Sequence, residues 1–372
     1  MNIREYVPIL RWKAAERDAL AKLDPIIRAQ ITPLFEFIMP GPKRDSTDYK
    51  TILKDSRSIF QDRLPKVVNE INKCSPSGSV FIDVHLVDGA LRSQALDFIL
   101  DSADFAESTL IPVTHIFPEK SSVADDLTRQ VVVNYGRSSG MGLCIRIDRS
   151  SLVDQDLSSA ITRFLVQNKL TMENTDVLVD LGIVDESDDP DGLARRLAVI
   201  PELNRWRSFI VAGGAFPKDL TQFEKHTRAQ IPRTDWEIAK SLSVSNQLVR
   251  VPTFSDYTIQ HPIFYENVTN ANVSASIRYT GDNQWDVLRG EGLRNEGGAG
   301  HQQYIAHARL IVKQNFFKGA NYSFGDNYII ERAQPSNILT GNPTTWLKAG
   351  INHHMTVVVK QLSSSFANKV PA

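Results

Sequence analysis

Three pairs of ionisable residues occupy alternate positions where short apolar runs end. The pairs are Arg11 and Lys13, Asp83 and His85, and Arg146 and Asp148, and single residues end other runs at Glu36, His115 and Asp180. Side chains two positions apart in a strand leave the backbone on the same side. If the runs are parallel strands of one barrel, their ends lie together and these groups converge on one site.

Two kinds of chemistry fit such a set. Asp, Glu and His side chains could hold a divalent metal ion that activates water, while Arg and Lys bind an anionic substrate. Alternatively, Arg11, Lys13 and Arg146 bind phosphate, and Glu36 or His85 acts as an acid or base without a metal. The sequence has no His-x-His pair and no His-Glu-x-x-His to decide between them. The cofactor therefore stays open, with a divalent metal ion as one compatible choice.

The same residues could instead neutralise one another at the rim. The pairs would be Arg146 with Asp148 or Asp180, Lys13 with Glu36, and His85 with Asp83. Charged groups in a barrel mouth are costly unless they are paired or used. The number of ionisable groups that converge here favours a functional site over a purely structural ring.

Eight short apolar runs supply the framework for these residues and alternate with segments of helical period. The runs cover residues 6–10, 33–35, 80–82, 110–113, 142–145, 177–179, 209–212 and 248–254. They are continuously apolar, as expected for parallel strands covered on both faces. No Gly-x-Gly-x-x-Gly follows the first run, which argues against an open doubly wound sheet. The pattern predicts an α/β protein with a (β/α)8 TIM-like barrel.

Helical period is present between the runs and again near the C-terminus. The predicted helices cover residues 14–23, 58–74, 93–106, 123–135, 157–167, 192–206 and 344–364. Between the eighth strand and the last helix lies a stretch of different character, rich in Gly, Asn and aromatic residues. It contains strand-like pieces at 275–280 and 304–312, and Thr280-Gly-Asp-Asn-Gln signals a hairpin.

These boundaries divide the chain into three parts. We predict a barrel over residues 1–264, a β-rich cap inserted between strand 8 and helix 8 over 265–341, and a final barrel helix and tail over 342–372. A connection after a barrel strand emerges at the catalytic face, so we expect the cap to cover the barrel mouth. Its ligand-binding candidates are Arg278, Tyr279, Arg289 and His301, several of which lie near glycines. His353 and His354 are predicted to be surface or packing residues.

The composition excludes some classes of protein. The chain has 372 residues and a formal net charge of −1, which argues against a surface wholly devoted to nucleic acid. Cys74 and Cys144 are too few for a disulfide framework or a multi-cysteine zinc site. No apolar signal region begins the chain, and no apolar run approaches the roughly 18 residues of a membrane span. We therefore expect a cytoplasmic protein without membrane contact.

Several short segments spread over nearly the whole chain form a characteristic set. They are Tyr6-Val-Pro-Ile-Leu-Arg-Trp-Lys13, Pro33-Leu-Phe-Glu36, Ile277-Arg-Tyr-Thr280, Arg289-Gly290, Gln303-Tyr304, Phe324-Gly-Asp326, Thr345-Trp-Leu-Lys348 and His353-His354. Together they resemble the "beta protein" family of bacteriophages and bacteria. The resemblance implies a phage or bacterial origin and a part in phage–host conflict. It brings no established catalytic residues, so the candidate site rests on strand-end positions.

Three functions are compatible with these observations. The first is a defence or counter-defence protein whose capped mouth binds an anionic, phosphate-bearing small molecule or nucleotide. The second is a hydrolase of a phosphoester or nucleotide that uses the same residues, and a metal held by Asp83, His85 or His115 would favour it. The third is a non-catalytic subunit that binds a protein partner of a defence system. Strand-end residues paired among themselves and an exposed apolar patch on the cap would favour this one.

Overall fold

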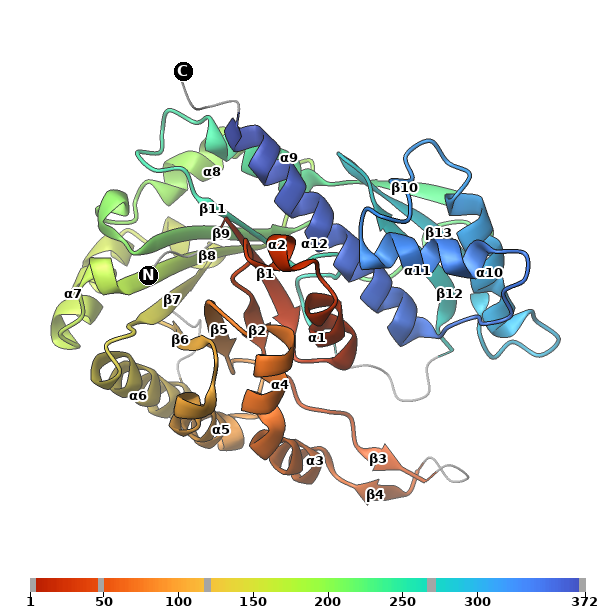
Figure 1. Ribbon diagram of the computed structural model, residues 1–372. Helices are drawn as coiled ribbons and strands as arrows, with labels where there is room; N and C mark the ends of the chain where they lie inside the picture. The colour runs from red at the N-terminus through yellow and green to blue at the C-terminus, as the bar shows by residue number, and fades with distance from the viewer. Residues whose placement is uncertain (1–4, 46–49, 117–121, 266–271, 368–372) are drawn as a thin grey trace.

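Eight parallel strands close into a barrel (Figure 1). The computed structural model describes residues 5–45, 50–116, 122–265 and 272–367. The barrel strands are β1 (Tyr6–Arg11), β2 (Leu34–Glu36), β5 (Ser79–Asp83), β6 (Thr109–His115), β7 (Leu143–Asp148), β8 (Thr175–Ile183), β9 (Ser208–Gly214) and β11 (Thr253–Asp256). The predicted TIM-like barrel is confirmed. Its eighth strand begins at Thr253 rather than at 248, directly after Pro252, which has no N–H for a ladder hydrogen bond.

Helices surround the barrel. They are α1 (Ala14–Ala21), α2 (Pro25–Arg28), α3 (Ser56–Arg63), α4 (Val67–Cys74), α5 (Gly89–Asp101), α6 (Val123–Ser138), α7 (Leu157–Gln167), α8 (Pro190–Leu197), α9 (Thr234–Ser243) and α12 (Pro343–Ala367). The single helix predicted over 58–74 is divided by a 3-10 turn, Leu64–Lys66, that contains Pro65. Helix α9 was not predicted, although it buries Trp236, Ile238 and Leu242.

Smaller elements complete the barrel domain. A two-stranded hairpin of β3 (Lys43–Arg44) and β4 (Ile52–Lys54) projects from the connection after β2 (Figure 1). Further 3-10 turns of the barrel domain are Ala103–Phe105, Arg149–Val153, Met172–Asn174 and Leu203–Arg205, and Gly300–Gln302 is a 3-10 turn of the insertion. No described helix is long and apolar enough to cross a membrane.

The insertion between β11 and α12 contains strands and helices. Strands β12 (Ser274–Thr280) and β13 (Gln284–Gly292) form the predicted antiparallel hairpin. The third strand of their sheet is β10 (Arg228–Pro232), which comes from the connection between β9 and β11. The insertion's sheet is therefore completed by residues that precede 265.

The prediction of a strand at 304–312 is wrong. It forms helix α10 (Gln303–Ile311), and α11 (Phe324–Ala333) follows. The buried residues of α10 include Tyr304, Ile305, Ala308 and Ile311, a spacing that fits a helix face better than a strand. Its β-branched and aromatic content suggested a strand because such residues favour pleated surfaces.

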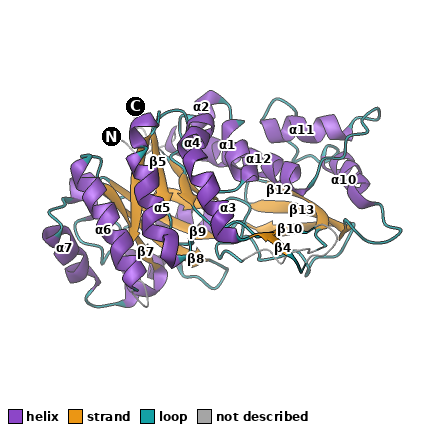
Figure 2. Ribbon diagram, turned by 90° about the horizontal axis from the view of Figure 1, so that it is seen from below, coloured by secondary structure: helices purple, strands orange, loops and turns teal. Residues whose placement is uncertain are grey.

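The insertion lies beside the barrel, next to α12, in the two views of Figures 1 and 2. The expectation of a cap over the mouth is therefore not met. Helix α12 explains the difference, because it presents two faces to two partners. Ile351, Met355 and Val358 belong to the barrel core, whereas Trp346 and Ala349 belong to the core of the insertion.

Two adjacent histidines on α12 connect it to β12. The ring of His353 contacts the Thr280 carbonyl oxygen at 2.9 Å and Asp326 Oδ2 at 2.7 Å. The ring of His354 contacts Thr280 Oγ1 at 3.0 Å and Asp256 Oδ2 at 2.8 Å. Both side chains are fully buried. They are packing residues rather than surface residues, and they join the barrel, α12 and the insertion through hydrogen bonds.

We expect Gly325→Ala to lower the free energy of unfolding by about 1–3 kcal/mol, the usual cost of overpacking. A Cβ at this position in α11 would overlap the Ala349 carbonyl oxygen of α12, and a backbone atom cannot turn away. Gly41→Ala is the matched control, because a Cβ there meets no atom within 4 Å. Urea denaturation of both variants measures the difference. Equal stability of the two would show that α11 and α12 are not closely docked.

Candidate functional site

Polar side chains form a layer at the C-terminal end of the barrel interior. Below them, the inward positions are apolar and include Ile9, Leu34, Phe81, Val113, Cys144 and Leu178. Two residues further along the same six strands stand Arg11, Glu36, Asp83, His115, Arg146 and Asp180, which we call the polar layer. Side-chain alternation keeps both sets on the inner face. Strand register places Arg11 beside Glu36, Glu36 beside Asp83, and His115 beside Arg146.

Arg146 is the centre of the polar layer. Its Nη1 donates to Glu36 Oε1 at 2.9 Å and to Asp83 Oδ2 at 2.7 Å. Its Nη2 donates to Asp180 Oδ2 at 2.6 Å and to Tyr257 OH at 2.8 Å. These four hydrogen bonds use every Nη hydrogen of the guanidinium, and the side chain is buried. Arg146 is therefore engaged inside the layer and has no Nη hydrogen left for a bound anion.

The two histidines of the candidate set lie against each other. The imidazole of His115 contacts Asp83 Oδ2 at 3.0 Å, and the His85 ring stacks on it with centroids 4.1 Å apart. The backbone N–H of His85 donates to Asp83 Oδ1 at 2.9 Å. Asp148 is level with Asp180 in the strand register and is partly exposed. The candidate residues at the ends of β2, β5, β6, β7 and β8 therefore lie close together at the C-terminal end of the barrel.

Burial and ion pairing act in opposite directions on these carboxyl groups. Burial alone would raise the pKa of Asp83 and of Asp180, but their contacts outweigh it and hold both below the ordinary value. His115 and Arg146 act on Asp83, and Arg146 and Tyr257 act on Asp180. Burial raises the pKa of Glu36 despite Arg146. The neighbouring Asp83 adds to this rise, and Glu36 Oε2 has no hydrogen-bond partner among the described residues.

Two further acid–base groups have pKa values displaced by burial. Burial lowers the pKa of His85 to about 4, and the neighbouring His115 adds to this effect. Burial raises the pKa of Asp148, with His115 opposing the shift. Near neutral pH, His85 is therefore uncharged, and Asp148 is a weaker acid than an ordinary aspartic acid.

Arg11 and Lys13 extend from the polar layer to the rim. Arg11 Nη2 donates to the carbonyl oxygens of His261 and Pro262 at 2.7 and 2.8 Å, and its Nε lies 3.8 Å from Glu36 Oε2. Lys13 Nζ lies 5.0 Å from the centroid of the Phe264 ring. Burial lowers the pKa of Lys13. Arg11 is thus a support for the loop after β11, whereas Lys13 reaches an open cleft.

The candidates from the insertion are held by contacts outside the polar layer. Arg278 donates to the Ile259 carbonyl oxygen at 2.7 Å, and Arg289 donates to that of Phe223 at 2.7 Å. Tyr279 donates to Asp326 Oδ1 at 2.8 Å, and His301 contacts the Gly341 carbonyl oxygen at 3.1 Å. None of these contacts reaches the polar layer, although Arg278 lines a cavity of about 440 Å³ together with Lys13 at the rim. The hydrogen bonds of these candidates instead fasten the insertion and the loops beside it.

A cleft of about 810 Å³ opens at the rim, between the loop after β2 and helices α1, α3 and α4. We call it the rim cleft. Its basic residues are Lys13, Arg17, Arg44, Arg63 and Lys66, and its aromatic residues are Trp12, Phe37, Phe60 and Phe264. Glu70 is the one acidic residue of the described lining, and it pairs with Arg17 at 3.0 Å. The rim cleft is therefore strongly positive with partly apolar walls.

Sequence reasoning missed several members of this region. Tyr257 completes the polar layer by donating to Asp180 Oδ2 at 2.6 Å, but it follows its strand, and a tyrosine there gives no charge signal. Glu16 lies in α1 between Ala15 and Arg17 and is buried, and burial raises its pKa to about 8. Residues 136–140 match Gly-x-Ser-x-Gly, yet they lie at the end of α6, where the motif serine, Ser138, donates through Oγ to the Tyr135 carbonyl oxygen at 3.3 Å. A nucleophile elbow needs a strand before that turn.

No group of three or more His, Cys, Asp or Glu side chains suited to a metal ion occurs within the described part of the chain. In the polar layer, Asp83 and Asp180 instead accept hydrogen bonds from Arg146. Cys144 lies inside the barrel, and Cys74 is buried in α4. Burial raises the pKa of the Cys74 thiol to about 12, so it stays protonated.

The closed ring of parallel strands with a polar layer at its C-terminal end defines a TIM-type barrel protein. The model of the Beta protein family matches residues 6–360. Because the match spans nearly all of the sequence, the chain belongs to the Beta protein family. No curated protein matches the chain.

We expect Arg146→Ala to lower the free energy of unfolding by about 3–5 kcal/mol, the cost of removing one partner from a buried ion pair. The change leaves Glu36, Asp83 and Asp180 buried without the cation that bonds all three. Arg195→Ala is the control, since its side chain is 60% exposed in a 3.6 Å pair and such pairs contribute about 0–1 kcal/mol. Urea denaturation measures both. A small, equal loss in the two variants would contradict a central role for Arg146.

Glu16→Gln should stabilise the protein increasingly as the pH rises. The pKa of Glu16 is raised from 4.5 to about 8 in the fold, so the unfolded chain releases this proton first and wild-type stability falls through that window. Glutamine has no proton to release. Melting temperatures at pH 5 and pH 7.5 should show a gain confined to the higher pH. Glu224→Gln, at an exposed position, is the control, and a pH-independent gain for Glu16→Gln would refute the expectation.

Proposed function

We propose that the rim of the barrel binds an anionic, phosphate-bearing ligand. The observation that carries the proposal is the rim cleft, which combines five basic side chains with aromatic walls in a space of about 810 Å³. Lys and Arg bind phosphate through charge-assisted hydrogen bonds. Pockets for drug-sized ligands have volumes of about 300–1,000 Å³.

The aromatic residues favour a ligand that carries a ring as well as phosphate. Trp12 stacks on Phe37 with centroids 4.8 Å apart, and Arg17 lies 4.6 Å from the Trp12 ring. Bases stack on aromatic faces in many nucleotide-binding and single-strand-binding proteins. A nucleotide therefore suits the rim cleft better than a sugar phosphate.

The polar layer has a different part in this proposal. Arg146 is neutralised by three carboxylates, whereas the rim cleft has five basic side chains and one acidic side chain in its described lining. The layer holds the strand ends in place, and through Arg11 it fixes the loop that carries Phe264. The ligand then binds across Lys13 at the edge of the layer.

A hydrolase acting on a phosphoester or nucleotide is the second candidate. Asp148 favours it, because the group is partly exposed and burial raises its pKa. Such an acid can deliver a proton to a leaving group. Release of phosphate or nucleoside by the wild-type protein, lost in Asp148→Asn, would convert the binding proposal into this one.

A non-catalytic interaction subunit is the third candidate. The pairing of strand-end residues around Arg146 favours it, as do exposed apolar side chains on the β3–β4 hairpin, where Ile52 and Leu53 are 52% and 56% exposed. We infer a cytoplasmic protein of phage or bacterial origin that acts in phage–host conflict. Membership of the Beta protein family is the support for that setting.

We expect ADP and pyrophosphate to raise the melting temperature of the protein by mass action, and adenosine to raise it little. The double variant Arg63→Gln with Lys66→Gln should bind ADP at least about tenfold more weakly, since a hydrogen bond to a charged group contributes about 1.5–3 kcal/mol. Isothermal titration measures the affinities. Lys66 and Arg63 are exposed, so the fold should be unaffected.

The control is a double variant with the same loss of charge elsewhere, Arg195→Gln with Lys225→Gln, both at exposed positions. It should bind ADP as the wild type does. Equal weakening in both double variants would reveal a general charge effect and overturn the assignment to the rim cleft. Absence of any response to ADP and pyrophosphate would overturn phosphate binding itself.

A further inference from the structure

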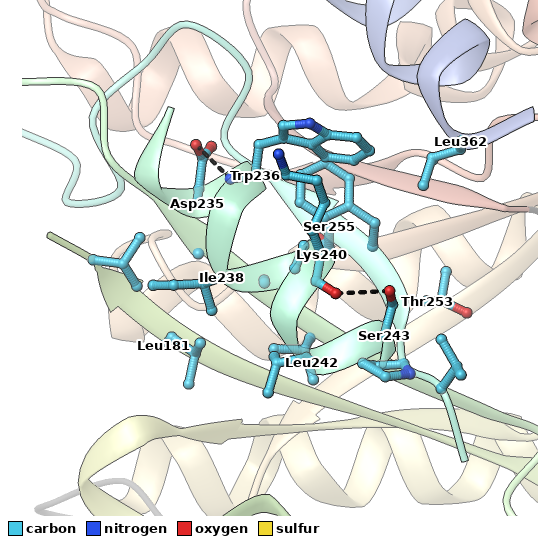
Figure 3. Close-up of a pocket in the computed structure, with 18 of the residues that line it drawn as sticks. Leu181, Asp235, Trp236, Ile238, Lys240, Leu242, Ser243, Thr253, Ser255 and Leu362 are labelled. Atoms are coloured by element: carbon cyan, nitrogen blue, oxygen red, sulfur yellow. Dashed lines mark hydrogen bonds between the residues drawn. The ribbon is translucent and has the colours of Figure 1, made fainter. Parts of the chain in front are cut away.

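A second cavity, of about 290 Å³, lies between helix α9 and strands β8, β9 and β11 (Figure 3). Its walls are mainly apolar, with Leu181, Ile238, Leu242 and Phe254 among the buried side chains. Val251 and Lys240 line it at exposed positions, so the space reaches the surface. It shares no lining residue with the rim cleft.

One polar side chain in this cavity lacks a full set of partners. Asp235 is 4% exposed and lines the space. Its Oδ1 accepts the Trp236 backbone N–H at 2.9 Å, whereas its Oδ2 has no hydrogen-bond partner among the residues that the structure describes. Figure 3 shows Asp235 and Trp236 on one side of the pocket, and Leu181 and Leu242 on the other. A buried carboxylate oxygen without a donor costs free energy that a ligand could recover.

The charges around Asp235 favour a cation. Asp256 lies nearby and accepts a hydrogen bond from Tyr6 OH at 2.6 Å. Asp256 also contacts His354, and burial lowers the pKa of His354 although the Asp256 carboxylate opposes this shift. Arg233 is the neighbouring cation; its Nη1 donates to Gln361 Oε1 at 2.9 Å, whereas its Nε and Nη2 have no hydrogen-bond partner among the described residues. Two carboxylates thus face one guanidinium. Burial raises the pKa of Asp235 to about 7; Arg233 opposes the shift and Asp256 adds to it.

We propose that this cavity binds a small primary amine with an apolar body, whose ammonium group donates to Asp235 Oδ2. Size supports the choice, since an apolar cavity of about 150 Å³ accepts benzene. A space of about 290 Å³ therefore has room for a ring and a short chain. The Trp236 ring also lines the cavity, and its cation neighbour is the Arg233 guanidinium, 5.4 Å from the ring centroid.

The site stands apart from the proposed phosphate site in both place and chemistry. The lining runs from Val251 and Pro252, before β11, to Gly213 near the end of β9 and Val184 after β8, and it lies between the strands and α9. Amine binding here requires neither the rim cleft nor a catalytic polar layer. The two proposals can therefore succeed or fail separately.

Three probes of matched shape test the proposal: phenethylamine, ethylbenzene and phenylacetate. Isothermal titration of the wild-type protein should give the tightest binding for phenethylamine, weaker binding for ethylbenzene and the weakest for phenylacetate. Asp235→Asn keeps the shape of the side chain and removes its charge. It should weaken phenethylamine at least about tenfold and leave ethylbenzene nearly unchanged.

Two cavity-filling variants, Ala239→Phe and Ser243→Phe, should abolish binding of all three probes, because both positions line the space. The second variant serves if the first fails to fold. The Arg63→Gln, Lys66→Gln protein should bind phenethylamine as the wild type does. Phenylacetate binding as tightly as phenethylamine, an unchanged amine affinity in Asp235→Asn, or binding that survives both filling variants would each overturn the proposal.

Discussion

The buried guanidinium of Arg146 is the constraint on which the barrel mouth depends. Its hydrogen bonds reach side chains of β2, β5 and β8 and the tyrosine that follows β11. Desolvating one cation and three carboxylates is costly, and it is tolerated only where geometry satisfies them together. The strand ends are therefore fixed in register with one another. A fixed ring of strand ends also fixes the loops above it, including the loop that Arg11 supports through two carbonyl oxygens.

Much of the barrel could be predicted because its strands are buried on both faces and its helices have clear apolar period. The insertion was harder to predict. Residues 304–312 carry strand-forming side chains at helical spacing, and packing against α11 and β12 decides in favour of a helix. Strand β10 could not be assigned to the insertion's sheet, since pairing with β13 is a long-range contact that no local pattern reports. The place of the insertion depends on the two faces of α12, which become distinct only after docking.

Some features of the candidate site could likewise be predicted from the sequence, and others could not. Alternation along each strand correctly brought Glu36, Asp83, Arg146 and Asp180 together, because period two is a local property. The sequence did not show which of these residues bond to one another and which face open space. Whether Arg146 faces three carboxylates or an open cavity depends on distances across the barrel. The rim cleft draws on Arg17, Arg63 and Lys66, which lie on helices and look like ordinary solvated charges in the sequence.

Strand β10 makes the two halves of the molecule inseparable. It leaves the chain before the last barrel strand, yet it pairs with β13, which is formed after that strand. Excising residues 265–341 would strip β10 of its neighbour and expose an unpaired edge, so the insertion is no removable module. During synthesis, β10 must wait for the ribosome to deliver some fifty further residues before its hydrogen bonds can form. Transfer of residues 265–341 into another barrel would fail unless the connection between β9 and β11, which carries β10, were transferred as well.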